Sequence, residues 1–197
     1  MTSTDTRDGI TLTCTPERQG ETIIMTYGVA NGGTSVAYVS DAGMRVEPST
    51  RTASADPDQV SIWLTHDRYA KVLKGVPPPP EDADVLFTIM PLMVALEPGA
   101  SIARTLILAL PLAEQSPYFG VGNLRDYRLA EIEGMVLAID VFARVPSGFV
   151  PRPVSYAPGH VNIGVRGTIP LLTRLSCRFP TRGMQMMVLT HAYPRPD

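Results

Sequence analysis

The sequence has few of the residues that bind metals or form disulfides. Its 197 residues include two cysteines and three histidines, and neither a C-x-x-C pair nor a Cys/His zinc spacing occurs. Cys14 and Cys177 lie in apolar stretches, so in a reducing compartment we expect two buried thiols. A disulfide is the alternative, because the first and last strands of a sandwich can be neighbours. We expect no metal site and no cofactor.

Catalytic motifs are missing as well. G-x-S-x-G, H-E-x-x-H, the Walker A sequence and G-x-G-x-x-G do not occur. His66 precedes an aspartate, His160 stands in a Pro-Gly loop and His191 ends a predicted strand, which are ordinary surroundings for surface histidines. Glu131 and Glu133 would lie about 7 Å apart on one strand face, where a solvated pair is a simpler interpretation than an acid/base pair or a calcium site. We therefore expect no enzymatic activity.

No apolar run is long enough for a membrane helix. The longest apolar stretch, residues 84–112, is interrupted by Pro91, Pro98 and Arg104 before it reaches roughly 20 apolar residues. The first nine residues, MTSTDTRDG, contain no basic segment followed by an apolar one, so no signal peptide is visible. These features predict a soluble, cytoplasmic protein that does not bind membranes.

Proline and glycine, in contrast, are abundant. There are 19 prolines and 16 glycines spread along the chain, with 44% hydrophobic and 18% charged residues. This composition is typical of a globular domain made of short strands and turns, and no long amphipathic helix is found. We expect a single all-β sandwich over residues 1–197, with about ten antiparallel strands and long Pro/Gly-rich loops. The Pro-rich segment 76–82 is then a loop, and a linker between two small β domains is the alternative.

Alternating apolar residues locate most of the strands. The predicted strands cover residues 10–15, 22–30, 35–40, 59–66, 127–145, 161–165, 171–179 and 184–191, with short ones near 44–46 and 69–73. In the strand over 171–179 the alternation points Leu175 and Cys177 inward and Arg174 outward. Residues 180–183 contain Pro and Gly and are expected to turn that strand back into the last one.

The apolar stretch 84–112 predicts two strands around a turn at residues 97–100. Pro98 can fix the first central position of a type II turn and Gly99 can supply the positive φ of the second. In a hairpin, Phe87 would face Leu110, and Arg104 would be the exception on an otherwise apolar face. Type II turns fit the twist of a two-residue hairpin poorly, however, so the turn is alternatively an arch between two sheets.

Charge is distributed unevenly. Residues 1–140 hold 10 basic and 18 acidic side chains (10 − 18 = −8), whereas residues 141–197 hold seven arginines and one aspartate (7 − 1 = +6). The simpler interpretation is that these arginines pair with acidic strands elsewhere. The other is that Arg174, Arg178 and Arg182 form a basic face for an acidic partner. No aromatic residues alternate with these arginines, so a nucleic acid is not expected.

Two segments resemble a known class of domain. The first is Tyr27-x-x-x-Asn31-x-Gly33 with the apolar residues 36–39 after it, and the second is residues 96–101 (LEPGAS) with alternating leucines after it. Together they are similar to bacterial immunoglobulin-like and fibronectin type III-like domains, and to intracellular proteinase-inhibitor-like sandwiches. The resemblance implies an immunoglobulin-like sandwich and fixes no function.

The function that we expect is therefore a binding one. The leading hypothesis is a non-enzymatic accessory domain that binds another protein, or itself as a homo-oligomer, through loops or an exposed sheet edge. The first alternative is a carbohydrate- or small-ligand-binding sandwich that uses Trp63, Tyr118 or Phe119. The second is a protease-inhibitor-like domain with residues 76–82 or 146–160 as its reactive loop.

Overall fold

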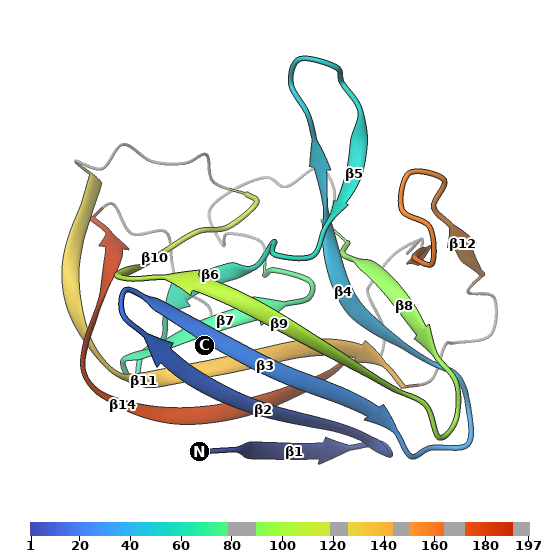
Figure 1. The fold of residues 1–197 in the computed structure, drawn as a ribbon, viewed down its shortest axis with the longest axis horizontal. Coiled ribbons are helices and arrows are strands. Elements are labelled where there is room, and N and C mark those ends of the chain that lie inside the picture. Colours follow the sequence, from blue (N-terminus) through green and yellow to red (C-terminus); the bar gives the residue numbers. More distant parts are fainter. Residues whose placement is uncertain (79–89, 119–125, 144–149, 164–171, 191–197) are drawn as a thin grey trace.

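The protein is built from β-strands. A computed structural model describes residues 1–78, 90–118, 126–143, 150–163 and 172–190, and it contains no helix in these ranges (Figure 1). The strands are β1 (Ser3–Arg7), β2 (Ile10–Gln19), β3 (Thr22–Asn31), β4 (Ala37–Val46), β5 (Ala53–Asp56), β6 (Ser61–Leu64), β7 (Tyr69–Lys74), β8 (Leu92–Leu96), β9 (Ser101–Ala109), β10 (Leu112–Ala113), β11 (Tyr127–Phe142), β12 (Pro151–Pro153), β13 (Val161–Ile163) and β14 (Thr173–Leu189).

The strands form two sheets that pack face to face. The first sheet has the order β1-β2-β3-β9, and the second has the order β10-β14-β11-β4-β8-β13-β12, with β7 beside β11 and β6 beside β7 (Figure 1). Most pairs are antiparallel, but β7 pairs with β11, and β10 with β14, in parallel. The all-β sandwich is therefore confirmed. The antiparallel arrangement holds for most pairs, but the described residues form 14 strands where about ten were expected, and two pairs are parallel.

Alternation along the strands builds the core between the sheets. Every second side chain of β3 and of the first half of β2 is buried, and buried positions of β11 and β14 face them from the second sheet. One buried cluster contains residues from both sides of segment 76–82. Leu175, Cys177 and Phe179 point inward as their alternation predicts, and both cysteines are buried free thiols.

Two local features were missed in the sequence. Asp8 and Gly9 both have positive φ and close a two-residue hairpin between β1 and β2, so a strand precedes Ile10. Residues 180–183 do not turn the chain back. Instead β14 continues through them beside β11 with a register shift between Ile132 and Gly134, because Gly183, at φ 69°, accommodates an irregularity within one long strand.

The turn at residues 97–100 is an arch between the sheets. Its preceding strand β8 pairs with β4 in the second sheet, whereas its following strand β9 pairs with β3 in the first. Gly99 has φ 79° and the Ala100 N–H bonds the Glu97 carbonyl at 3.0 Å, as the type II pattern requires. The hairpin that opposes Phe87 and Leu110 is therefore wrong and the arch is confirmed. Phe87 itself lies outside the described residues.

Asn31 fixes the arch in place. This residue is 1% exposed, and its Nδ2 donates to the carbonyls of Leu96 (2.8 Å) and Ser35 (2.9 Å). Its Oδ1 accepts the Gly33 N–H at 2.9 Å, and its backbone exchanges bonds with Gly99 and Ala100. The two segments that carry the resemblance are thus in direct contact, and one buried amide satisfies the backbone groups of both turns.

Strand β4 leaves the second sheet part of the way along its length. Its pairing with β8 is irregular between Ser40 and Ala42, and only Val39 and Tyr38 pair with β11. Beyond this irregularity β4 pairs with β5 to form a two-stranded ribbon, residues 43–56, which we call the arm. Strand β7 takes the vacated place beside β11. Figure 1 shows the arm projecting away from both sheets.

Candidate functional site

A charged cluster lies where β4 leaves the sheet. Asp41, 3% exposed, stands at the irregularity of β4 and accepts two bonds from Arg104 of β9, Nε to Oδ1 at 2.7 Å and Nη2 to Oδ2 at 3.1 Å. His160, in the segment between β12 and β13, places Nε2 3.0 Å from the same Oδ2. The cluster therefore ties the two sheets and a loop to one carboxylate. It also explains why an arginine occupies the inward-facing side of β9.

The charges in this cluster alter each other's protonation. Burial alone would raise the pKa of Asp41, but the hydrogen bonds and charge of Arg104, with the contact to His160, outweigh it and hold that pKa below its ordinary value. Lys74, at the end of β7, is 4% exposed, and burial lowers its pKa to about 8 although Asp41 and Asp58 oppose the shift. Its Nζ donates to the Pro57 carbonyl.

Two polar atoms near this cluster have no hydrogen-bond partner within the described part of the chain. They are Nδ1 of His160 and Oγ of Ser40, the residue next to Asp41. An Asp–His pair with an open ring nitrogen is one part of a general-base system. However, both oxygens of Asp41 are engaged by Arg104, and the described ranges hold no group of three metal-ligating side chains. The arrangement favours a structural link between the sheets.

His160 shows what sequence reasoning missed. It was predicted as a surface histidine, but it is only 17% exposed and bonded to a carboxylate 119 residues away. Its immediate neighbours Gly159 and Val161 carry no signal of that contact. His66 is exposed, as expected, and His191 lies outside the described residues.

The predicted basic face on β14 is largely neutralised. Arg174 binds the fully buried Asp140 through Nε at 2.7 Å and Nη2 at 2.9 Å, and it also donates to the Val76 carbonyl at 3.2 Å. Arg178 pairs with Asp67, and its guanidinium lies 3.6 Å from the centre of the Tyr69 ring. These pairings support the simpler interpretation of the charge asymmetry.

The third residue of that predicted face, Arg182, lies in β14, but its side chain is outside the described part. Partner binding by the three arginines therefore stays a prediction.

The predicted ligand-binding aromatics do not form one described surface. Trp63 is 8% exposed and packs with Leu73 and Ala138, and Lys71 lies 5.3 Å from the centre of its ring. Tyr118 is half-buried after β10, and Phe119 lies outside the described residues. Of the two predicted inhibitor loops, residues 79–82 and 146–149 are also outside them. Sugar binding and protease inhibition stay predictions.

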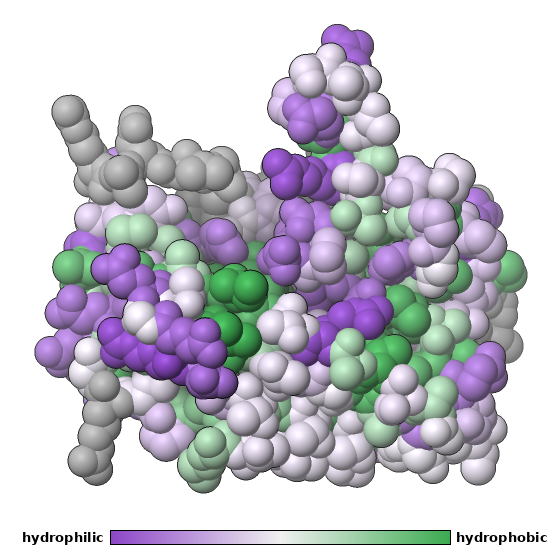
Figure 2. Space-filling model, viewed as in Figure 1, coloured by the Kyte–Doolittle hydropathy of each residue, from purple (hydrophilic) through white to green (hydrophobic). Residues whose placement is uncertain are grey.

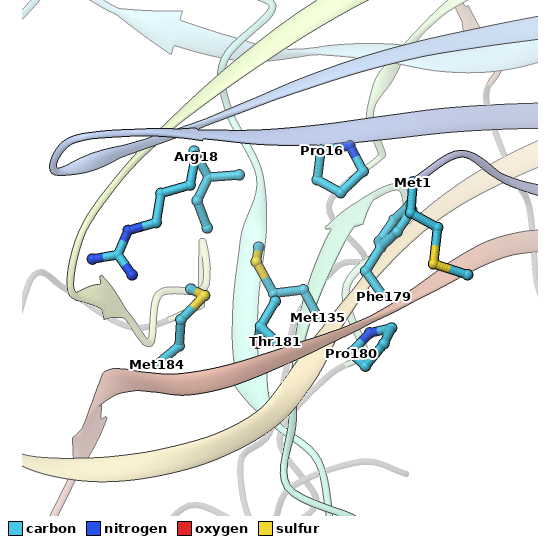
Figure 3. Close-up of a pocket in the computed structure, with 9 residues that line it drawn as sticks. Met1, Pro16, Arg18, Met135, Phe179, Pro180, Thr181 and Met184 are labelled. Atoms are coloured by element: carbon cyan, nitrogen blue, oxygen red, sulfur yellow. The ribbon is translucent and has the colours of Figure 1, made fainter.

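A pocket of about 290 Å³ opens at one end of the sandwich. Its floor is apolar, with Met135 of β11 and Met184 and Phe179 of β14, and Arg18 of β2 stands on the opposite wall (Figure 3). The pocket lies beside the irregularity of β14, where Thr181 has a buried hydroxyl without a hydrogen-bond partner among the described residues. An apolar floor with one cation and one open hydroxyl suits a small amphipathic anion.

The arm presents an exposed apolar face. Met44 and Val46 of β4 lie on one side of the ribbon and are 52% and 48% exposed. Their partners across the ribbon are Ala55 and Ala53 of β5. Among the described residues the arm is contacted near its base, where the Tyr156 hydroxyl donates to Sδ of Met44 at 3.3 Å and Ala55 packs against the buried cluster of Ala42, Leu92 and Ala157.

The chain matches no protein-family model, no curated protein and no solved structure. Within the described ranges there is also no helix with the length and apolarity needed to cross a bilayer.

Proposed function

We propose that this chain is a non-enzymatic, immunoglobulin-like interaction domain that binds a partner protein through the arm. The order of the principal strands supports the immunoglobulin-like assignment. The seven principal strands are, in chain order, β2, β3, β4, β8, β9, β11 and β14. The first, second and fifth of them (β2, β3 and β9) share one sheet, and the third, sixth and seventh (β4, β11 and β14) share the other. The fourth strand, β8, pairs with the third instead of the fifth, which departs from the constant-type arrangement.

The exposed apolar face of the arm is the observation that carries the proposal. An isolated two-stranded ribbon is only marginally stable in water, and the half-exposed side chains of Met44 and Val46 stabilise it less than they would if they were covered. Met44 and Val46 would gain roughly 1 to 2 kcal/mol each if a partner covered them. Methionine also adapts its shape to a partner surface. The partner surface that fits is an apolar groove wide enough for a β-ribbon.

Site-specific photo-crosslinking tests the arm directly. A photoreactive phenylalanine derivative replaces Met44, and cells that naturally produce the protein are irradiated. We expect one discrete crosslinked product, identified by mass spectrometry, and at least a tenfold weaker yield when Val46→Glu is added. The matched control carries the same photoreactive residue at Thr13, which is exposed on the first sheet.

The proposal is wrong if positions 44 and 13 give the same products, or if Val46→Glu leaves the yield from position 44 unchanged. If the crosslinked product contains only two copies of this chain, the arm binds a second copy of the same chain and not a different protein.

The pocket favours a second function, binding of a small apolar carboxylate. Its apolar floor would hold the body of the ligand, and Arg18 would pair with the carboxylate. We expect aromatic and short-chain carboxylates to shift the NMR signals of the Met135 and Met184 methyl groups, and Arg18→Gln to weaken binding about tenfold. Arg45→Gln, on the arm, is the control. Binding that ignores Arg18, or no binding by any such acid, excludes this function.

A further inference from the structure

The free edge of the first sheet carries a regular row of backbone groups. The Asn31 N–H donates to Ala100, and the Leu110 N–H donates to Glu21, at the two ends of the β3–β9 pairing. In an antiparallel pair the bonded positions recur at every second residue, so the even-numbered residues of β9 direct their N–H and C=O groups to β3. The odd-numbered residues direct theirs outward. They are Ser101, Ala103, Thr105, Ile107 and Ala109.

This edge has one feature that discourages strand pairing, the inward-pointing charge of Arg104, whose Nη1 also donates to the Ala103 carbonyl at 3.1 Å, but it lacks the others. Residues 101–109 contain neither proline nor lysine, and Ile107 is 61% exposed. No strand among the described residues pairs with the outer side of β9. The opposite edge is different: β1 meets the second sheet there, where the Ser176 N–H donates to Asp5 at 2.8 Å. Strand β9 is thus the edge at which the sheet can be extended.

The row is symmetric about its central residue. If two β9 strands pair antiparallel with Thr105 opposite Thr105, Ser101 faces Ala109 and Ala103 faces Ile107. All five outward residues then find bonding partners, which gives about ten hydrogen bonds, with the Ala103 carbonyl accepting a second bond besides that from Arg104. Arg104 points inward to Asp41 and would stand opposite Leu106, so this register opposes no like charges.

The outer face of the first sheet also presents little charge. Rows of Thr, Ala and Gly cross it, including Thr13, Gly28 and Ala103, and Figure 2 is pale over β1 and the right-hand parts of β2 and β3, whereas the β2–β3 hairpin at the left is hydrophilic. Two such faces side by side would not repel each other. The edge is therefore complementary to itself in hydrogen bonding, length and charge.

We propose that a second copy of this chain pairs with β9 about a two-fold axis at Thr105, which joins the two first sheets into one continuous eight-stranded sheet. The edge consists of β9 and the arm of residues 43–56, so each can be altered by substitution without changing the other. The pairing is a symmetric case of β-strand addition.

The oligomeric state of the full chain tests this pairing. We expect a dimer by analytical ultracentrifugation at micromolar concentration. Thr105→Lys places two ammonium groups opposite each other, and like charges repel. Thr105→Pro removes an outward N–H that β3 does not use. Each variant should therefore weaken dimerisation at least tenfold. Thr13→Lys adds the same charge to the same face two strands away and should remain dimeric, as should Met44→Glu on the arm.

Cysteine crosslinking tests the register. Thr105→Cys places two thiols on directly opposed residues, with Cα atoms about 5.5 Å apart, and should give a disulfide-linked dimer under mild oxidation. Ser101→Cys faces Ala109 and should not. A monomer at all concentrations overturns the proposal. So does a dimer that survives Thr105→Lys and Thr105→Pro, or that crosslinks equally at 101 and 105. If β9 binds a partner of another kind, the chain alone would be a monomer and the Thr105→Cys variant would form no disulfide-linked dimer.

Discussion

At the scale of single residues, Asp41 determines how the two sheets meet. Its position in the irregularity of β4 turns a carboxylate toward Arg104 on the opposite sheet and His160 on a neighbouring loop. Removing one partner of a buried ion pair costs more than the pair contributes, because the other charge remains without compensation. Arg104 is 37% exposed, however, so solvent offsets part of that cost.

Asp41→Asn should therefore destabilise the protein by about 1–3 kcal/mol near neutral pH, as measured by urea unfolding. Because the folded-state pKa of Asp41 lies below its ordinary value, its stabilising effect is complete above about pH 4 and is lost as the pH falls through the folded-state pKa. The difference between the two proteins should shrink in that acid range. Glu17→Gln, at an exposed site, is the control. If Asp41→Asn lowers the free energy of unfolding by the same amount at pH 3 and pH 7, the charge of the Asp41 carboxylate is not the cause of the destabilisation.

Lys74, unlike Asp41, destabilises the folded protein at neutral pH. Burial lowers its pKa to about 8, so between pH 8 and 10.5 the unfolded chain binds a proton that the folded chain does not, and stability rises with pH there. Lys74→Met should stabilise the protein by about 1 kcal/mol at pH 7, since part of the gain is offset by the lost bond to Pro57. Urea unfolding at pH 7 and at pH 10.5 measures this gain in stability, which should have disappeared at pH 10.5. A variant less stable at pH 7 would refute the argument.

At the scale of elements, the arch between β8 and β9 depends on one buried amide. Asn31 bonds backbone groups of both adjoining turns and is almost completely inaccessible. Without its side chain, the carbonyl of Leu96 and the N–H of Gly33 lose their partners.

Asn31→Ala should lower the free energy of unfolding by about 2–4 kcal/mol in thermal or urea denaturation, because several buried polar groups lose partners at once. Asn162→Ala, an exposed asparagine in β13, should change it by less than about 0.5 kcal/mol. If both variants unfold like the parent protein, the amide does not stabilise the arch.

At the scale of the whole molecule, one buried cluster spans both sheets. A shared core of this kind predicts that the chain unfolds as one cooperative unit. Trp63 is the single tryptophan and belongs to β6 of the second sheet, whereas circular dichroism reports on both sheets.

Urea unfolding followed by Trp63 fluorescence and by far-ultraviolet circular dichroism should therefore give coincident transitions. Two separated transitions would instead favour two small domains joined by residues 76–82. Asp41→Asn should shift both transitions together, because the ion pair with Arg104 connects the sheets.

Local patterns in the sequence were sufficient for the strands and several turns. Alternation placed β2, β3 and the inward side chains of β14, and Pro98-Gly99 defined a type II turn. Asp8-Gly9 was an equally readable hairpin signal that was overlooked. Residues 180–183 were misread as a turn, because proline and glycine occur both in turns and in irregular positions within a strand.

The sequence by itself determined that this chain buries alternate residues of extended segments, since that pattern requires only neighbours along the chain. Which sheet receives each strand was decided by the tertiary structure, because a turn such as 97–100 fits a hairpin or an arch, and the choice depends on pairing with distant strands and on bonds such as those of Asn31. The same holds for Asp41, Arg104 and His160. They lie far apart in sequence, and a single carboxylate joins them only after both sheets and the loop before β13 have been placed around it.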